Sequence, residues 1–234
     1  MQSFSLLIGR WLQRFPNLHT AVKAAYTARL VAATPASTPF GFKFVGSPAM
    51  QRGEFEAEEV ARFLAIVGGY DILVNVGANT GYYVCLARSK GLRVVAVEPD
   101  ERNLKLLMRN CEINAWMDIE VLPVAVGDQA GLQPIYGGGT AASLVQGWAG
   151  AGTARQLVAV DTLDSLLGER LAGQRVLVLM DVEGFELQAL KGAQRLLRMN
   201  PAPDWIVEVC INEHQPTGRA VNPHLEETFA VFHD

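Results

Sequence analysis

Residues 71–81 read Asp-Ile-Leu-Val-Asn-Val-Gly-Ala-Asn-Thr-Gly, and this stretch decides the fold. Asp71 to Val76 is a short, nearly continuous apolar run, which is typical of a parallel strand covered on both faces. The segment from Asn75 to Gly81 follows the strand and opens a helical pattern. In an open α/β sheet this first turn lies at the carboxyl edge, where ligands bind, and its glycines let the main chain approach a ligand closely.

The alternation of strands and helices continues along the chain. After a helical pattern from Glu54 to Val67, further apolar runs predict strands at Arg93 to Val97, Ile119 to Val126, Arg175 to Met180 and Trp205 to Val209. Helical patterns lie between them at Tyr82 to Ser89, Asp100 to Asn114 and Phe185 to Met199. The order predicts a doubly wound, mostly parallel α/β sheet. The long, glycine-rich interval from Gly127 to Ala159 is interpreted as a flexible excursion near the strand ends.

Charge is unevenly placed along the 234 residues. Residues 1–53 carry six basic residues and no acid, so the formal charge of −4 divides into +6 for this arm and −10 for the remainder. Phe4 to Leu18 form an apolar stripe at helical spacing, which either packs on the domain or docks on a membrane or a partner. A Pro-, Ser- and Gly-rich stretch from Thr34 to Pro48 reads as a linker or loop. We therefore expect a basic helical arm and linker at 1–52 and a catalytic domain at 53–234.

Composition excludes several classes of protein. No apolar stretch approaches the roughly 20 residues that cross a bilayer. The three cysteines are widely spaced and lack histidines at metal-ligand intervals, which favours neither a disulfide framework nor a zinc site. We expect a cytoplasmic protein in a reducing compartment.

The glycine loop predicts a nucleoside site. Glu98 ends the second strand, where a carboxylate accepts hydrogen bonds from both hydroxyls of a ribose. A dinucleotide site requires Gly-x-Gly-x-x-Gly, but this loop has Asn79 in place of the second glycine, and no Walker lysine follows. A ligand with ribose and adenine but no phosphate fits better, which indicates S-adenosylmethionine rather than NAD.

Taken together, these motifs resemble the FkbM-type methyltransferases, a family of class I S-adenosylmethionine-dependent enzymes. One departure is Asn75, where the family usually has aspartate. The resemblance runs from about Pro39 to Glu213 through Thr38 to Phe42, Gly53 to Glu56, the glycine loop, Val97 to Pro99, Leu122 to Asp128, Thr162 to Asp164, Asp181 to Glu186, Leu190 to Gly192 and Val207 to Val209.

The resemblance implies a Rossmann-like methyltransferase sheet and specific cofactor contacts. It implies that Gly77, Asn79 and Gly81 line the methionine part and that Glu98 holds the ribose. Asp128, with Val126 or Gly127, would border adenine, although a capping role for Asp128 remains open. The cofactor-binding residues that we expect are Asn75, Gly77, Ala78, Asn79, Gly81, Glu98 and Asp128.

Carboxylates after the fourth and fifth strands are the candidates for catalysis. Asp181 ends the fourth strand, and a carboxylate there can orient an acceptor hydroxyl and take its proton, with Glu183 or Glu208 assisting. The alternative is that these three carboxylates hold a magnesium ion, but we expect no metal because the family match requires none. His214, just past the fifth strand, is either a further base or a solvated loop side chain.

The resemblance points to O-methylation of a hydroxyl on a sugar, a glycan or a polyketide-like natural product. The loops at 137–143 and 35–46 are candidates to fold over the cofactor, and Phe40, Phe42, Phe44, Tyr136 and Trp148 either stack on sugar rings or pack internally. The alternatives are a nucleic-acid methyltransferase and a non-catalytic S-adenosylmethionine-binding module. We expect no nucleic-acid partner, because the body is acidic. The oligomeric state stays open.

The class I fold ends in an antiparallel hairpin that follows a final helix. Here the predicted fifth strand ends near Cys210, and the residues after it supply at most a helix from Leu225 to Phe232. We therefore expect the C-terminal hairpin to be absent or incomplete, and the sheet edge to be completed by other means such as a partner.

Overall fold

The computed structural model describes residues 25–151 and 154–233. Its centre is a parallel sheet, as predicted, and its five strands lie in the order β10-β9-β3-β4-β5. The strands are β3 (Ile72–Val76), β4 (Arg93–Val97), β5 (Glu120–Leu122), β9 (Val176–Met180) and β10 (Asp204–Val207). The chain leaves β3 toward β4 and β5 and later returns to β9 on the other side, so the strand order reverses between β3 and β9. Ligands bind at such a reversal in doubly wound sheets.

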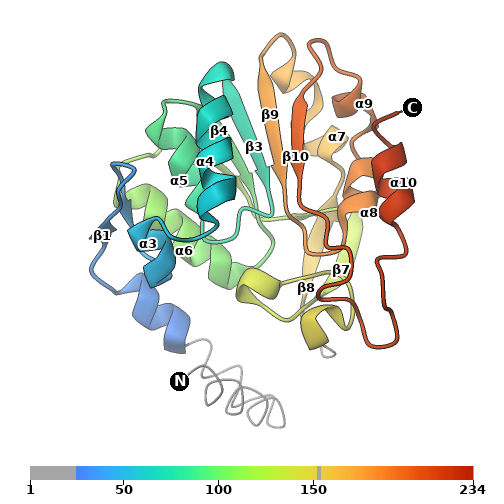
Figure 1. The fold of residues 1–234 in the computed structure, drawn as a ribbon, viewed down its shortest axis with the longest axis horizontal. Helices are drawn as coiled ribbons and strands as arrows, with labels where there is room; N and C mark the ends of the chain where they lie inside the picture. The colour runs from blue at the N-terminus through green and yellow to red at the C-terminus, as the bar shows by residue number, and fades with distance from the viewer. Residues whose placement is uncertain (1–24, 152–153, 234) are drawn as a thin grey trace.

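Helices cover both faces of this sheet, which explains why its strands are mostly apolar. One face packs against α4 (Ala57–Ile66), α5 (Tyr82–Ser89) and α6 (Glu101–Glu112), and Leu73 of β3 points into that core. The other face packs against α7 (Leu163–Leu167), α8 (Glu186–Lys191) and α9 (Gln194–Leu197), and Val74 of β3 points there. In Figure 1, α4 lies on one side of β9 and β10 and α8 lies on the other.

Two predicted elements are divided in the structure. The predicted strand from Ile119 to Val126 becomes β5 and β6 (Ala125–Val126), which belong to different sheets on either side of Pro123. Proline has no amide hydrogen for a ladder, so the strand is interrupted there. The predicted helix from Phe185 to Met199 is divided into α8 and α9, because α8 ends at Lys191 with Gly192 as its C-cap.

The interval from Gly127 to Ala159 was expected to be a flexible excursion, and this prediction is wrong. It holds β7 (Gly131–Tyr136) and most of β8 (Ala154–Asp161), which pair as an antiparallel hairpin, and β8 also pairs with β6. Ile135 and Val158 are buried in a small core of their own. Several glycines of the interval lie in the short helices η2 (Gly139–Ala141) and η3 (Trp148–Gly150), and such residues obscure the alternating pattern of the strands in the sequence.

The stretch from Thr34 to Pro48, predicted to be a linker or loop, packs on the sheet domain instead. It contains β1 (Ala36–Ser37) and β2 (Lys43–Phe44), and it leads into α3 (Pro48–Arg52). Phe42 and Phe44 are buried in the core beside α5, because aromatic side chains gain more from burial than from exposure in a linker. Asn110 of α6 binds the main chain of Val45 in both directions, at 2.7 and 3.0 Å.

The remaining helices complete the described chain. They are η1 (Val67–Gly69), η4 (Gly168–Leu171) and α10 (Leu225–Ala230), and residues 25–31 are also helical. After β10 the described residues contain α10 and no further strand. The apolar stripe from Phe4 to Leu18 lies outside the described residues. No helix in the described ranges is both long enough and apolar enough to cross a membrane.

Replacement of Phe44 tests whether the segment before residue 53 belongs to the domain core. The Phe44 side chain is fully buried, so Phe44→Ala should lower the free energy of unfolding by about 3 to 5 kcal/mol. Leu132→Ala is the control, because Leu132 is 69% exposed and its removal should change stability by less than about 0.5 kcal/mol. Chemical denaturation of both variants measures the difference. Equal stabilities would contradict a core role for this segment.

Candidate functional site

The site is built where β3 and β9 end side by side. Val76 is paired with Met180, so the next residues of the two strands, Gly77 and Asp181, emerge together. The amide of Asp181 donates to the carbonyl of Val76 at 2.9 Å. A Cβ atom on Gly77 would lie 1.7 Å from the carbonyl oxygen of Asp181, and Gly77 has φ +80°. Glycine is therefore required at this position both for space and for backbone conformation.

The glycine loop is tied to β4 and to the N-terminal segment. The amides of Gly77 and Ala78 both donate to the carbonyl of Val97 at 2.9 Å. Asn110 of α6 donates to the carbonyl of Thr80 at 2.9 Å, so one side chain joins the loop to Val45. The loop is consequently held from both sides before any ligand binds.

Glu98 is buried and surrounded by hydrogen-bond donors. One carboxylate oxygen accepts from the amide of Asn79 at 2.8 Å, and the other accepts from the amide of Asp100 at 2.8 Å and from the side chain of Asn103 at 3.1 Å. Burial raises the pKa of Glu98 to about 7, although these donors pull it down. The donors fix the carboxylate, and the oxygen that accepts only from Asn79 can still accept a further bond.

Two cavities meet at the Gly77–Asp181 contact. We call the one beside Glu98 the first cavity, with a volume of about 50 Å³, and the one beside α4 the second cavity, with about 450 Å³. The residues that line both are Gly77, Asn79 and Asp181. The first cavity is otherwise bounded by β4, β6 and the 139–144 loop, through Glu98, Asn103, Val126, Ile135, Thr140, Ser143, Leu144, Glu183 and Phe185 among others. The second is bounded by α3, α4, α5, β9 and β10, through Met50, Phe55, Glu56, Glu59, Asn75, Ala78, Tyr82, Tyr83 and Glu208 among others.

Asp181 stands at the meeting point with an unusually basic carboxylate. Burial, and then the negative charges of Glu208, Glu183 and Glu186, raise its pKa to about 8. Glu186 is also buried, and it accepts from the amide of Gly184 at 2.7 Å while burial raises its pKa to about 7. The acids after β9 therefore lie in surroundings that favour their protonated forms near neutral pH.

Glu183 is held on the side of the first cavity. Its carboxylate accepts from the indole N–H of Trp148 at 2.6 Å and lies 3.9 Å from Nδ1 of His214. Its carbonyl accepts from the hydroxyl of Ser143 at 2.6 Å. Gly184 follows with φ +92°, and a Cβ there would lie 2.5 Å from the Trp148 ring. This packing fixes Glu183 in place and brings His214 beside it.

The structure brings most of the predicted site residues together. Asp181, Glu208 and Glu183 lie around the two cavities, as do Asn75, Gly77, Ala78, Asn79 and Glu98. Gly81 does not line either cavity; it precedes α5 with φ +84° and approaches Leu107 of α6. Asp128 is exposed and lines neither cavity.

Several aromatic candidates pack internally. Phe42 and Phe44 contact the ring of Tyr82 in the core, and Trp148 is 2% exposed.

Sequence reasoning missed Asn103, which orients Glu98, and the acids Glu56 and Glu59 of the second cavity. Only their three-residue spacing on a predicted helix carried any signal for Glu56 and Glu59. No group of three or more histidine, cysteine or acidic side chains suited to a metal ion occurs in the described ranges.

A substitution at Gly77 tests the contact that joins the two strands. Gly77→Ala should destabilise the protein more than Gly91→Ala, because both glycines have positive φ but only Gly77 lacks space for a Cβ. Gly91→Ala should cost about 1 to 2 kcal/mol from backbone strain alone. Thermal unfolding of the two variants measures the difference. Similar melting temperatures would show that strands β3 and β9 do not need this close approach.

Comparison with known proteins identifies the family. The family model of the methyltransferase FkbM domain matches residues 75–227, while a search of curated proteins finds no match. Among solved structures, the SAM-dependent methyltransferase from Agrobacterium tumefaciens is 13% identical with a TM-score of 0.36, over 63% of this chain and 39% of that chain. The structure of EvdMO1 is 23% identical with a TM-score of 0.28, over 42% and 23%. This chain thus spans less than half the length of either. The family match extends from β3 to α10, and the chain belongs to the methyltransferase FkbM family.

Proposed function

We propose that this methyltransferase uses S-adenosylmethionine to methylate a hydroxyl group on a sugar, a glycan or a polyketide-like natural product. Family membership supports methyl transfer. The observation that carries the proposal is Asp181, a half-buried acid with a raised pKa at the junction of a nucleoside-type cavity and a larger cavity. Such a junction is where a donor and an acceptor would meet.

The residues around the first cavity fit the adenosine half of the cofactor. Glu98 offers a buried carboxylate oxygen to a ribose hydroxyl, and Val126, Ile135 and Phe185 offer apolar walls to a base. Gly77 and Asn79 line both cavities, so a ligand that contacts them can extend into the second cavity. This suits the methionine half of the cofactor. When bound, S-adenosylmethionine supplies a methyl group on a positively charged sulfur.

The first cavity must widen to admit an adenosine. Its volume of about 50 Å³ is far below the roughly 300 Å³ at which small-molecule sites begin. The 139–144 loop forms one wall and contains Gly139, with φ +70°, where added side-chain atoms would meet nothing. We infer that this loop opens to admit the cofactor and then closes over it, which would exclude water.

Asp181 is proposed to act as the general base. An alcohol is a weak nucleophile near neutral pH, so a carboxylate that accepts its proton as the new carbon–oxygen bond forms lowers the barrier. The raised pKa makes Asp181 a stronger base than an exposed aspartate, at the expense of being protonated below about pH 8. Glu208 lines the second cavity and adds negative charge, whereas Glu183 faces the first cavity and positions the segment after β9.

Asp181→Asn tests the assignment of the base. We expect kcat to fall by about 10² to 10⁴ while S-adenosylmethionine still binds, because the amide keeps the shape but cannot accept the proton. Isothermal titration measures binding, and mass detection of the methylated acceptor measures turnover. Glu169→Gln removes an exposed carboxylate elsewhere and serves as the control. Unchanged turnover in Asp181→Asn would remove Asp181 from this role, and cofactor binding without any turnover in the native chain would favour a binding module.

The raised pKa of Asp181 also predicts pH dependence. In native protein kcat/KM should rise about tenfold per pH unit up to about pH 8, where Asp181 loses its proton. Stability should change in the opposite sense. Between pH 3.8, the ordinary pKa of the side chain, and about pH 8, the folded chain holds a proton on Asp181 that the unfolded chain releases, so rising pH destabilises the fold. Asp181→Asn removes this contribution, so its melting temperature should fall less over that range. If the melting temperatures of the two proteins fall equally with rising pH, this pKa does not belong to Asp181.

A further inference from the structure

The second cavity has a distinct electrostatic character. All four charged residues that line it are acids, namely Glu56, Glu59, Asp181 and Glu208, and none of its described lining residues is basic. None of the four forms an ion pair within the part of the chain that the structure describes. Negative charge thus converges on a cavity of about 450 Å³ without any internal compensation.

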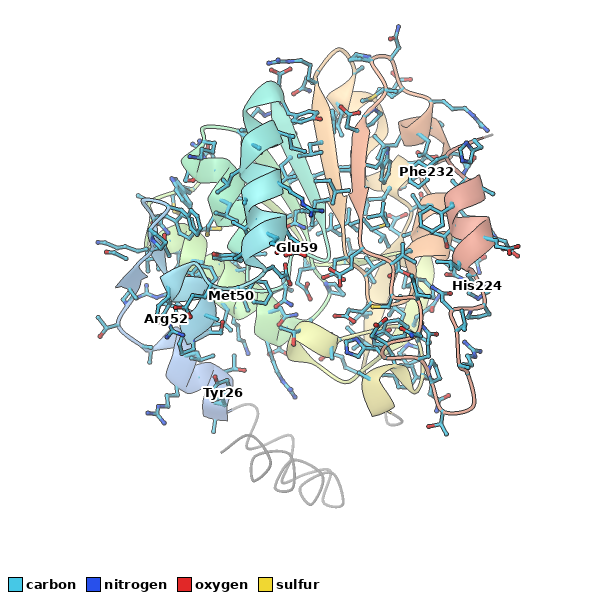
Figure 2. The ribbon with its side chains drawn as sticks, viewed as in Figure 1. Tyr26, Met50, Arg52, Glu59, His224 and Phe232 are labelled. Atoms are coloured by element: carbon cyan, nitrogen blue, oxygen red, sulfur yellow. The ribbon has the colours of Figure 1, made fainter. Side chains whose placement is uncertain are left out.

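Glu56 and Glu59 come from the start of α4, on the wall that faces β10. Glu56 precedes α4 with φ +45°, and its carboxylate does not cap the helix. It accepts instead from the hydroxyl of Tyr83 at 2.8 Å. Figure 2 shows Glu59 on the lower part of α4, on the same side of the molecule as Met50 of α3, which also lines the cavity.

These carboxylates also repel one another. Partial desolvation raises the pKa of Glu56, and the negative charges of Glu208 and Glu59 raise it further, although the Tyr83 bond lowers it. Acids that repel one another in a cleft destabilise the fold unless a cation compensates them. A bound positive charge would relieve this repulsion.

An independent observation at Tyr82 also indicates a ligand. Tyr82 lines the second cavity and is 3% exposed, and its hydroxyl has no hydrogen-bond partner. Burial raises the pKa of Tyr82, and the negative charge of Glu56 raises it further. A buried hydroxyl without a partner costs stability, so such groups in native structures call for an explanation. A hydrogen-bonding group of a bound molecule would provide the missing partner.

The acids lie away from the adenosine side of the site. Glu98 lines the first cavity, whereas Glu56, Glu59 and Tyr82 line the second cavity only. The methionine half is expected to enter the second cavity beside Gly77 and Asn79, and a volume of about 450 Å³ leaves room there for an acceptor as well. Glu56 and Glu59 lie on the α4 wall of that shared cavity.

We propose that the acceptor is a hydroxylated amine, such as an amino sugar, whose ammonium group is bound by Glu56 and Glu59 and whose polar edge meets the hydroxyl of Tyr82. This inference rests on the proposed function and names the substrate class of the same site. The carboxylates select for the positive charge, and Asp181 is left to act on the hydroxyl. An N-acetylated or otherwise neutral acceptor brings no positive charge and leaves the acids uncompensated when it is bound. It should therefore bind more weakly.

The experiment compares glucosamine with N-acetylglucosamine, two probes with the same remaining hydroxyls but a charged or a neutral nitrogen. Binding is measured by titration with S-adenosylhomocysteine present, at a pH below the pKa of the sugar amine. We expect glucosamine to bind at least about tenfold more tightly, and the preference to shrink at high salt because charges are screened. Equal binding of the two sugars would overturn the proposal.

Variants on α4 identify the groups that bind the cation. Glu59→Gln and the double change Glu56→Gln with Glu59→Gln should each remove most of the preference for glucosamine, whereas affinity for S-adenosylmethionine should stay within about twofold. Glu58→Gln is the matched control: Glu58 lies in the same turn, is 84% exposed at its side chain and pairs loosely with Arg62 at 3.8 Å. It should keep the full preference.

Two further outcomes separate this inference from the proposed function. If Glu59→Gln loses S-adenosylmethionine as strongly as glucosamine, the acids serve the cofactor and the inference is wrong. If the native chain prefers glucosamine but mass detection finds no methyl transfer to any hydroxylated amine, the proposed function fails while the cation site stands. Melting temperatures of all variants show whether each remains folded.

Discussion

The close approach of Gly77 to the main chain of Asp181 is the constraint on which the site depends. It places the ends of β3 and β9 in contact at the point where the strand order reverses. The glycine loop is thereby brought beside the acids that follow β9, and the two cavities meet at this contact. A side chain at residue 77 would separate the strands and displace Asp181 from both cavities.

Desolvation governs the chemistry that this arrangement allows. Asp181, Glu98 and Glu186 are all surrounded by protein, and burial is the largest cause of the raised pKa of each. The surroundings of Glu98 and Asp181 differ, because Glu98 accepts from three hydrogen-bond donors of the protein whereas Asp181 faces mainly other acids. Glu98 is thus stabilised as a fixed acceptor for a ligand, and Asp181 is kept basic. This difference suits them to binding and to proton transfer, respectively.

The N-terminal segment and the β7–β8 hairpin show where sequence reasoning stopped. Both contain glycine, proline and small polar residues that obscure the short apolar patterns of their strands. Phe44 reads in the sequence as a loop aromatic that either stacks on a sugar or packs internally, and the structure places it in the core next to Tyr82. Trp148 reads in the same two ways, and the structure buries it with its indole N–H donating to Glu183. Neither contact follows a period along the chain, because each joins segments more than 30 residues apart.

The sequence by itself determined the parallel sheet, the glycine loop and the acids at the ends of its strands, because these depend on local periodicity and on residues adjacent to each strand. Only the tertiary structure decided which acids share a cavity. It brought Glu56 and Glu59 from α4 to face Asp181 and Glu208, and it left Asp128 exposed outside both cavities. Burial and the distance between charges arise from packing between remote segments, so the electrostatics of the site exists only in the folded chain.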